Sequence, residues 1–400
     1  MHVIIGVLYK EMPLKPSILK GVETILGSKK VENFVNEAED FLILEDNSGR
    51  IRISNKSSMY MKDFSSSHYV TGIIAAVKGR LDDKGVLMME DILYNNVMNY
   101  SLPKRVQSTI VIEDSNRSSI SSYKMQYAQN NIVAFVSGLE FGHTDYTGKS
   151  ALARNLLIDF FQGRLSTNEG VHNMIKRINR IIIAGNSINS PDDIDLVEKG
   201  SFMKQDLNSR VMRTLLKNYE EFDEFLNTIS HSVHVDVMPG SEDNSSSFFP
   251  QLPLNEIMFP VSSSNDSVNF VSNPYSCIVD DLLFTGTSGQ NIKNIQQYSR
   301  ISESSLDIME KTLEWNHLSP SAPDTMRTFP INTRDPLIIE NVPNVYFTGN
   351  QKSFETKISF YNQVPLRLIS IPKFYSSHSI VLLDSSTLEV CEYSFVFFNL

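Results

Sequence analysis

Four short turns carry the side chains of this sequence that could do chemistry, because each follows an apolar run. They are residues 137–140, 185–189, 240–243 and 349–352, which follow apolar runs at 132–136, 181–184, 233–238 and 345–347. Short apolar runs that end in small-residue turns are typical of an α/β sheet that presents polar groups at its carboxyl edge. Carboxylates and imidazoles at such an edge could hold a pair of metal ions. Here those ligand types are largely missing.

The elements that must position these turns follow a barrel-like first part. Over residues 1–112 the sequence predicts short strands joined by turns, including hairpins at 46–49 and 82–85, with a short helix at 15–26. This pattern fits an OB-fold, a small Greek-key barrel. We see few arginine or aromatic residues on an obvious face of it, so we expect protein contact rather than nucleic acid binding.

A polar linker at 113–127 then leads into a second domain, residues 128–400, whose hydrophobic period changes. Strands alternate with helices predicted at 150–162, 172–177 and 204–230, and the last has apolar residues recurring along one face. Further strands follow, among them one at 276–285 and a run of short strands from Lys357 onward. We therefore expect a layered α/β domain after an all-β amino-terminal part.

Composition narrows the function classes. The chain has 400 residues, 41% of them apolar, and a net charge of −10, the wrong sign for a broad grip on phosphate backbones. The two cysteines, Cys277 and Cys391, exclude a disulfide framework. The amino terminus has no signal-peptide pattern and no apolar run reaches membrane-helix length, so we expect a soluble intracellular protein.

Local motifs offer little support for an enzyme. Residues 142–150 lie between a strand and a helix as a P-loop does, but five residues separate the glycines where four are needed. His231, His234 and Asp236 are close in sequence but offer no further ligand at metal spacing, so a structural role is favoured. Asp280 and Asp281 are expected to mark a solvent turn, and the glycines at 286–291 to let chains pass closely.

Whole phrases between the turns resemble the small (B) subunit of eukaryotic DNA polymerase delta. The resemblance runs from Gly6 to near Phe354. Its most specific phrases are DVMPG at 236–240, NPY at 273–275, GTSGQN at 286–291, SPSAPDT at 319–325 and VYFTGN at 345–350. That family implies an OB-fold barrel followed by a calcineurin-like phosphoesterase α/β sandwich that has lost its activity.

Active relatives implied by this resemblance hold two metal ions with Asp and His residues at the four turns. The matching positions here are Gly138, Glu140, Asn186, Asn189, Ser241, Glu242, Asp243, Asn350 and Lys352. Glycine offers no ligand, amides replace carboxylates, and Lys352 puts a cation where a cation must bind. Glu140, Glu242 and Asp243 could hold one weak magnesium ion but could not rebuild a two-metal site. We expect no catalytic residue, bound metal or cofactor.

The resemblance implies a nuclear, non-catalytic scaffold of DNA polymerase delta in DNA replication and repair. Its expected partners are the carboxyl-terminal region of the catalytic subunit and a further accessory subunit, with the sliding clamp and DNA reached indirectly and no membrane. Two alternatives stay open: an active metallophosphoesterase or 3′–5′ exonuclease, and the B subunit of polymerase alpha or epsilon.

Overall fold

A computed structural model of the chain describes residues 1–16, 33–54, 65–95, 131–143, 148–165, 168–189, 204–330, 334–361 and 364–395. The helix expected at 15–26, the linker at 113–127 and the middle of the loop at 142–150 lie largely or wholly outside these residues. The chain forms two compact units, one of residues 1–100 with 290–342 and one of residues 101–289 with 343–400. The predicted boundaries at 112 and 128 stay a prediction.

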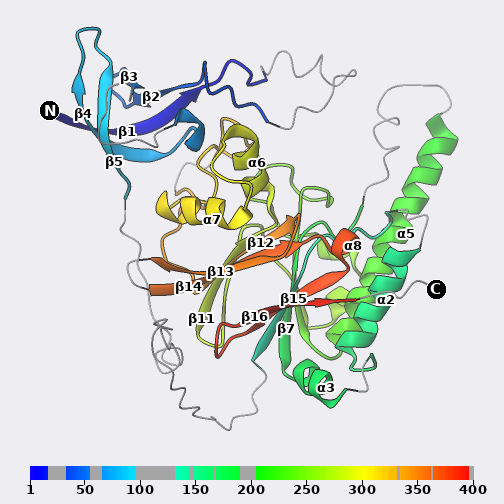
Figure 1. Ribbon diagram of the computed structural model, residues 1–400. Helices are drawn as coiled ribbons and strands as arrows, with labels where there is room; N and C mark the ends of the chain where they lie inside the picture. The colour runs from blue at the N-terminus through cyan, green and yellow to red at the C-terminus, as the bar shows by residue number, and fades with distance from the viewer. Residues whose placement is uncertain are drawn as a thin grey trace, which may run out of the picture. The chain divides into compact units, whose positions relative to one another are not determined.

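The first unit contains a closed five-stranded barrel, which confirms the OB-fold expectation (Figure 1). Its strands are β1 (His2–Glu11), β2 (Phe41–Glu45), β3 (Arg50–Ser54), β4 (Ile74–Leu81) and β5 (Leu87–Leu93), with a 3-10 turn at Ser66–His68. They are hydrogen-bonded in the order β1-β2-β3-β5-β4, and β4 returns to β1. Residues alternate across each strand, so Leu8, Leu42, Leu44 and Val77 fill the inside of the barrel.

Two helices, α6 (Gln290–Tyr298) and α7 (Ser305–Glu314), belong to the same unit as the barrel although they are distant in sequence. The end of α6 meets the barrel through Lys10, whose ammonium donates to the Tyr298 carbonyl oxygen at 2.9 Å. Phe34 stacks on the Tyr298 ring, with centroids 5.0 Å apart. The barrel therefore packs against a segment that lies about 200 residues after its last strand.

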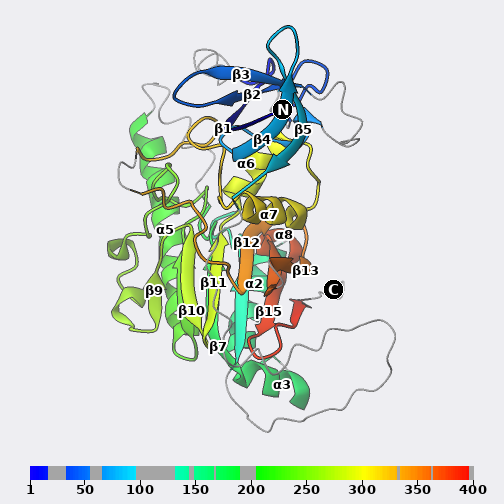
Figure 2. The ribbon, with the colours of Figure 1, turned by 90° about the vertical axis from the view of Figure 1, so that its left-hand side faces the viewer.

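The second unit has two sheets and confirms the expected α/β architecture (Figure 2). One sheet has the order β16-β15-β6-β7-β8-β9 and the other β10-β11-β12-β14-β13. The first sheet's strands are β6 (Ile132–Val136), β7 (Ile178–Ala184), β8 (His234–Met238), β9 (Val268–Phe270), β15 (Ser379–Asp384) and β16 (Val390–Ser394). The second contains β10 (Tyr275–Val279), β11 (Leu282–Thr287), β12 (Val345–Gln351), β13 (Glu355–Tyr361) and β14 (Val364–Pro372).

Two apolar clusters hold these layers together. Phe135, Ile182, Phe284 and Phe347 belong to the cluster between the two sheets. The opposite face of the six-stranded sheet is covered by α2 (Lys149–Phe161), α3 (Glu169–Lys176) and α5 (Lys204–Ser230). Shorter helical turns lie at Glu256–Met258, Ser262–Ser264 and α8 (Phe374–Ser377). Among the described residues, no helix is both long and apolar enough to cross a bilayer.

One predicted strand is wrong. Residues 276–285 are not a single strand but a hairpin, in which β10 and β11 pair antiparallel around Asp280 and Asp281. Both aspartates have left-handed backbone angles, with φ of 52° and 66°. Such angles suit a two-residue hairpin turn, and aspartate tolerates them better than most residues do. The expectation of a turn at these aspartates is confirmed.

Candidate functional site

The four predicted turns meet at one edge of the second unit. Strands β6, β7 and β8 are parallel neighbours, so their carboxyl ends lie side by side. The carboxyl end of β12, which runs to Gln351 and so includes most of the predicted turn 349–352, joins them from the other sheet, because the Asn350 main-chain N–H donates to Ser137 Oγ at 2.9 Å. The sequence pattern therefore located a real convergence of strand ends.

The first two turns are joined through their main chains. The Gly138 N–H donates to the Gly185 carbonyl oxygen at 2.9 Å, and the Glu140 N–H to that of Asn186 at 3.1 Å. Gly185 has a left-handed φ of 82°, and a Cβ on it would lie 2.6 Å from the Ser288 Cβ. A larger residue would push these segments apart, so glycine is what allows the turns to pack this closely.

Asp243 ties the third turn to the second. Its Oδ1 accepts the N–H groups of Ser187 at 2.8 Å and Ile188 at 2.9 Å, and its Oδ2 accepts that of Gly240 at 2.8 Å. Burial is the largest influence on this carboxyl and raises its pKa to about 6, while the backbone N–H groups act in the opposite direction. Both oxygens are thus engaged in holding the loops.

Asn186 is buried at the centre of the second turn, with a left-handed φ of 54°. Its Oδ1 accepts the Glu242 N–H at 3.1 Å and lies 3.5 Å from Ser241 Oγ. Ser241 and Glu242 are exposed, and the two side chains are hydrogen-bonded at 3.1 Å. The amide of Asn186 is therefore oriented by the third turn.

Asn350 links the fourth turn to the end of β7 and to the residue after β11. Its Nδ2 donates to the carbonyl oxygens of Ala184 at 3.1 Å and Ser288 at 2.9 Å. The residue has a left-handed φ of 57°, a conformation that asparagine adopts more readily than most side chains. Both amide protons are used to connect loops.

Lys373 contributes a cation that sequence analysis missed. Its ammonium donates to Glu140 Oε1 at 2.9 Å, and the side chains are 39% and 10% exposed. Lys373 directly follows β14, so it occupies a fifth strand end at the same edge. The mostly apolar stretch 368–371 ahead of it was the available signal. Lys352, by contrast, is exposed beyond β12.

The remaining predicted residues lie further from this network. Asn189 contributes its main chain, through its N–H to the Phe141 carbonyl oxygen at 2.8 Å. His231 and His234 are exposed. Asp236 is buried and accepts hydrogen bonds from Arg180 at 2.6 Å and from the Tyr275 hydroxyl at 3.0 Å. These contacts support the structural role predicted for Asp236.

A cluster of buried amide and hydroxyl side chains is hydrogen-bonded to the third turn, and sequence analysis missed it as well. Asn273 Nδ2 donates to Gln251 Oε1 at 2.8 Å and to Ser288 Oγ at 2.7 Å. Gln251 Nε2 in turn donates to the Gly240 carbonyl oxygen at 2.9 Å.

Among the described residues, no group of three or more His, Cys, Asp or Glu side chains is arranged to hold a metal ion.

The charged and polar groups at this edge therefore interact mainly with one another. Lys373 faces Glu140, the Asn350 amide faces two carbonyl groups, and Asp243 faces three N–H groups. Buried polar groups that are paired with one another fix a loop arrangement, because separating any pair leaves a desolvated partner. What this arrangement does well is to hold five strand ends in one geometry.

Comparison with known proteins identifies related chains. A family model described as the B subunit of DNA polymerase alpha/epsilon matches residues 133–356, and one described as the OB-fold domain of the DNA polymerase delta subunit matches residues 1–92. The DNA polymerase delta small subunit of Arabidopsis thaliana is 34% identical, covering 98% of this chain and 81% of that protein.

Further relatives and one solved structure are also similar to this chain. The corresponding protein of Oryza sativa subsp. japonica is 32% identical over 98% of this chain and 83% of its own length. That of Saccharomyces cerevisiae is 28% identical over 96% and 77%. Among solved structures, an archaeal phosphodiesterase aligns with 66% of this chain and 99% of its own, at 13% identity and a TM-score of 0.31.

Proposed function

The chain belongs to the family of DNA polymerase delta small subunits and is an accessory subunit of that polymerase. We propose that the edge where its four turns meet has no catalytic activity and that the domain serves as a scaffold. The observation that carries this proposal is that Glu140, Asp243 and the Asn350 NH₂ group are each hydrogen-bonded within the edge, although the Asn350 Oδ1 atom has no partner among the described residues. An ammonium bonded to Glu140 and an amide bonded to two carbonyl groups occupy places where a two-metal phosphoesterase needs free ligands.

The charge balance supports the same proposal. Two divalent ions need several carboxylates around them, and the four turns supply Glu140, Glu242 and Asp243. Glu140 is paired with Lys373, and Asp243 is fully committed to backbone N–H groups. A metal ion entering here would have to displace hydrogen bonds that hold the loops, which costs stability.

A phosphodiesterase assay tests the silence of the site. We expect the purified chain with added manganese to show no turnover of a generic aryl phosphodiester above a buffer blank. Glu242→Gln and Asp243→Asn serve as matched variants, because a contaminating enzyme would be unaffected by them. Turnover by the wild-type chain that both variants abolish would overturn the proposal and favour an active metallophosphoesterase.

The scaffold role implies specific partners. We propose that the chain binds the carboxyl-terminal region of the polymerase delta catalytic subunit and a further accessory subunit, in the nucleus, with the sliding clamp reached through those partners. Pull-downs with the carboxyl-terminal regions of the alpha, delta and epsilon catalytic subunits test this. We expect retention of the delta region; preference for alpha or epsilon, or binding to none, would contradict the proposal.

A further inference from the structure

Strand β1 pairs with two different neighbours along its length. Strand β4 runs beside its first part, from His2 to Val7, and β2 runs beside its second part, from Val7 to Glu11. Residues 2–6 therefore have a strand on one side and, in the described part of the chain, none on the other. The second part of β1 closes the barrel, so the first part leaves one strand edge open.

Hydrogen bonds at Leu8 show which main-chain groups face the open edge. The Leu8 N–H donates to the Ile73 carbonyl oxygen at 2.8 Å, and the Leu8 carbonyl oxygen accepts the Gly72 N–H at 2.7 Å. In an antiparallel ladder the two main-chain groups of one residue point to the same side, and successive residues alternate. Val3 and Ile5 consequently direct their N–H and C=O groups away from β4, to the side where β2 does not run.

The side chains along this edge are apolar and exposed. Val3 is 62% exposed and Ile5 is 67% exposed, on the outer surface of the barrel. Natural edge strands are commonly protected from other chains by lysine or proline, and residues 2–7, HVIIGV, contain neither. A free edge with exposed β-branched side chains pairs readily with another extended chain.

Aromatic rings on the neighbouring outer surface are already in contact with cations of the barrel. The guanidinium carbon of Arg52 lies 4.1 Å from the centroid of the Phe41 ring, and that of Arg50 lies 5.9 Å from the Tyr9 ring. A partner at the β1 edge therefore meets main-chain groups and aliphatic side chains rather than open aromatic faces.

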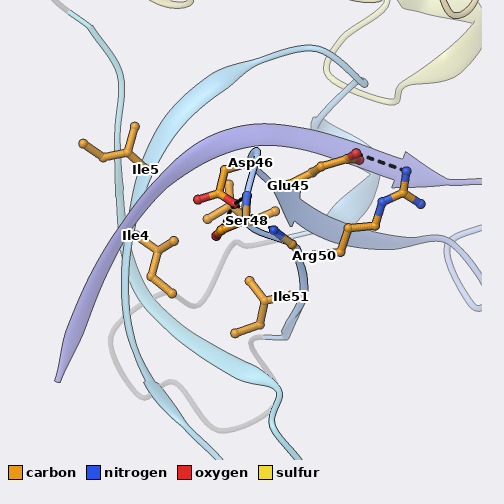
Figure 3. Close-up of a pocket in the computed structure, with 9 residues that line it drawn as sticks. Ile4, Ile5, Glu45, Asp46, Ser48, Arg50 and Ile51 are labelled. Carbon is orange, nitrogen blue, oxygen red and sulfur yellow. Dashed lines mark hydrogen bonds and ion pairs between the residues drawn. The ribbon is translucent and has the colours of Figure 1, made fainter.

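A hollow of about 210 Å³ lies beside the open edge. Its apolar lining includes Ile4 and Ile5 on β1 and Leu44 on β2. Figure 3 shows Ile4 and Ile5 on one side of it and the Glu45–Arg50 pair on the other. The volume is below the ~300–1,000 Å³ of ordinary small-molecule sites, so the hollow suits one apolar side chain of a bound segment.

The rim of this hollow carries a negative charge. Arg50 is paired with Glu45 at 3.1 Å, so these two charges largely offset each other. Asp46 Oδ1 accepts hydrogen bonds from the Ser48 hydroxyl at 2.6 Å and from the N–H groups of Ser48 and Gly49 at 2.7 and 3.0 Å. These bonds lower the pKa of the Asp46 carboxyl, which is therefore ionised at neutral pH. Among the lining residues that the structure describes, no cation offsets this charge.

These features define the chemistry of an occupant. Open main-chain groups pair with another extended main chain, the hollow takes an apolar side chain, and the charge of Asp46 favours a lysine or arginine. A second copy of this chain could offer its own β1, but two chains with a net charge of −10 each repel one another. The charges therefore favour a strand from a different protein.

We propose that the open edge of β1 binds an extended apolar segment of a partner protein as an added antiparallel strand, with a lysine or arginine beside Asp46. This inference rests on the scaffold role proposed above and specifies how one partner is held. Main-chain hydrogen bonds to Val3 and Ile5 give affinity, and the residue opposite Ile4 gives selectivity by placing its side chain in the hollow. Opposite residues of two strands share a face, so that residue and not its neighbours points into the hollow.

A labelled heptapeptide, Lys-Thr-Val-Leu-Val-Thr-Lys, tests this inference by fluorescence anisotropy with the full chain. With its leucine opposite Ile4, the N–H groups of its two valines face β1 and those of its two threonines face away. N-methylation of both valines should weaken binding at least about fivefold, since two main-chain hydrogen bonds are lost. N-methylation of both threonines should change it less than about twofold, since no such bond is lost. No binding of the parent peptide, or equal affinities of the two methylated peptides, would overturn the inference.

Variants of the chain test the same edge. Ile5→Pro removes an N–H that faces the open edge but leaves the pairing with β4, so the affinity for the peptide should fall at least about fivefold. Asp46→Asn keeps the Oδ1 acceptor but removes the charge, and should lower the affinity about twofold and reduce its dependence on salt.

Ile74→Thr is the matched control, because Ile74 is 60% exposed on β4 and lies opposite Val7, where the open edge has ended. We expect it to bind the peptide as the wild type does. Equal losses in Ile5→Pro and Ile74→Thr would overturn the inference, since they would place the contact on the outer surface and not on the edge. Should Ile5→Pro fail to fold, as judged by circular dichroism, the two methylated peptides decide.

Hydrogen exchange, read at single residues, tests the edge in the assembled polymerase complex. The amide protons of Val3 and Ile5 should exchange at least about tenfold more slowly in the complex than in the isolated chain, because a strand then covers them. Those of Ile4 and Gly6 face β4 and should be equally protected in both. Unchanged exchange at Val3 and Ile5 would overturn the inference.

Two further outcomes separate this inference from its alternatives. If the pull-down described above retains the delta region while the β1 edge stays unprotected in the complex, the inference fails and the scaffold role stands. If light scattering shows a dimer of the chain that Ile5→Pro abolishes, the edge belongs to a second copy and the inference is overturned.

Discussion

Lys10 is a buried amine whose environment makes the stability of the first unit depend on pH. Its side chain contacts the Tyr298 carbonyl oxygen and lies 3.7 Å from Asp40. Burial lowers the pKa of this amine from 10.5 to about 8, against the opposing effect of Asp40. In the unfolded chain the amine keeps its ordinary pKa, so between pH 8 and 10.5 the unfolded state binds more protons.

We therefore expect the free energy of unfolding of the wild type to rise, relative to Lys10→Met, as the pH increases from 8 to 10.5. The difference between the pKa values of the unfolded and folded states sets an upper limit of about 3 kcal/mol on this change. Urea unfolding of both proteins across that pH range measures it. Parallel curves for the two proteins would show that the amine is not desolvated as described.

Asp243 should contribute to the stability of the folded second unit, because it holds two of the turns together. Asp243→Asn keeps the shape but turns an NH₂ group toward backbone N–H donors, which should cost about 1–3 kcal/mol. The pKa of the carboxyl is raised from 3.8 to about 6, so the folded state binds the proton more tightly. The advantage of wild type over variant should consequently shrink as pH rises from 4 to 6. Chemical denaturation at several pH values tests this, and an advantage that grows with pH would contradict it.

Strands β11 and β12 depend on one glycine. A Cβ at Gly286 would lie 2.3 Å from atoms of the Phe347 ring, which is fully buried between the sheets. Gly286→Ala should therefore force a shift of that ring or of the strand pair, at a cost of about 1–3 kcal/mol. Gly49→Ala is the control, since nothing lies within 4 Å of its Cβ position. Equal thermal unfolding midpoints for the two variants would contradict the prediction that a side chain at position 286 clashes with Phe347.

Sequence patterns located whole elements better than their connections. The helix predicted at 204–230 has those bounds in the structure, because its apolar face is long and regular. The turn at Asp280 and Asp281 was predicted, but the strand predicted over 276–285 was wrongly carried across it, because two aspartates without a glycine are a weak hairpin signal within an apolar stretch. Lys373 was missed because it follows β14 in a region predicted only as short strands. Convergence of the four turns was predictable, since parallel strands end at a common edge.

Pairing across strands was also beyond the sequence. Arg52 and Phe41 are 11 positions apart, and whether they meet depends on the register of β2 against β3. A one-residue slip would turn one of them into the barrel. The hairpin signal at 46–49 fixed the turn but not which side chains would share a face.

Across the molecule, the grouping of residues 290–342 with the barrel makes a further prediction. Tyr298→Ala removes the ring that stacks on Phe34 and should loosen β1 and α6 together. We expect hydrogen exchange to show reduced protection in both, with β6–β8 unchanged. Tyr393→Ala is the matched control in the second unit, where that ring contacts Phe160 with centroids 4.6 Å apart. Loss of protection in β1 alone would contradict the shared unit.

Because this unit is built from two distant segments, its parts are synthesised at different times. The barrel strands end at Leu93, whereas α6 begins at Gln290. At ~5–20 residues per second, a ribosome needs roughly 10–40 s to supply the helix that receives the Lys10 ammonium. For that interval Lys10 lacks the carbonyl oxygen that accepts its hydrogen bond in the complete chain. The hydrogen bond that joins the barrel to α6 therefore forms only late in synthesis.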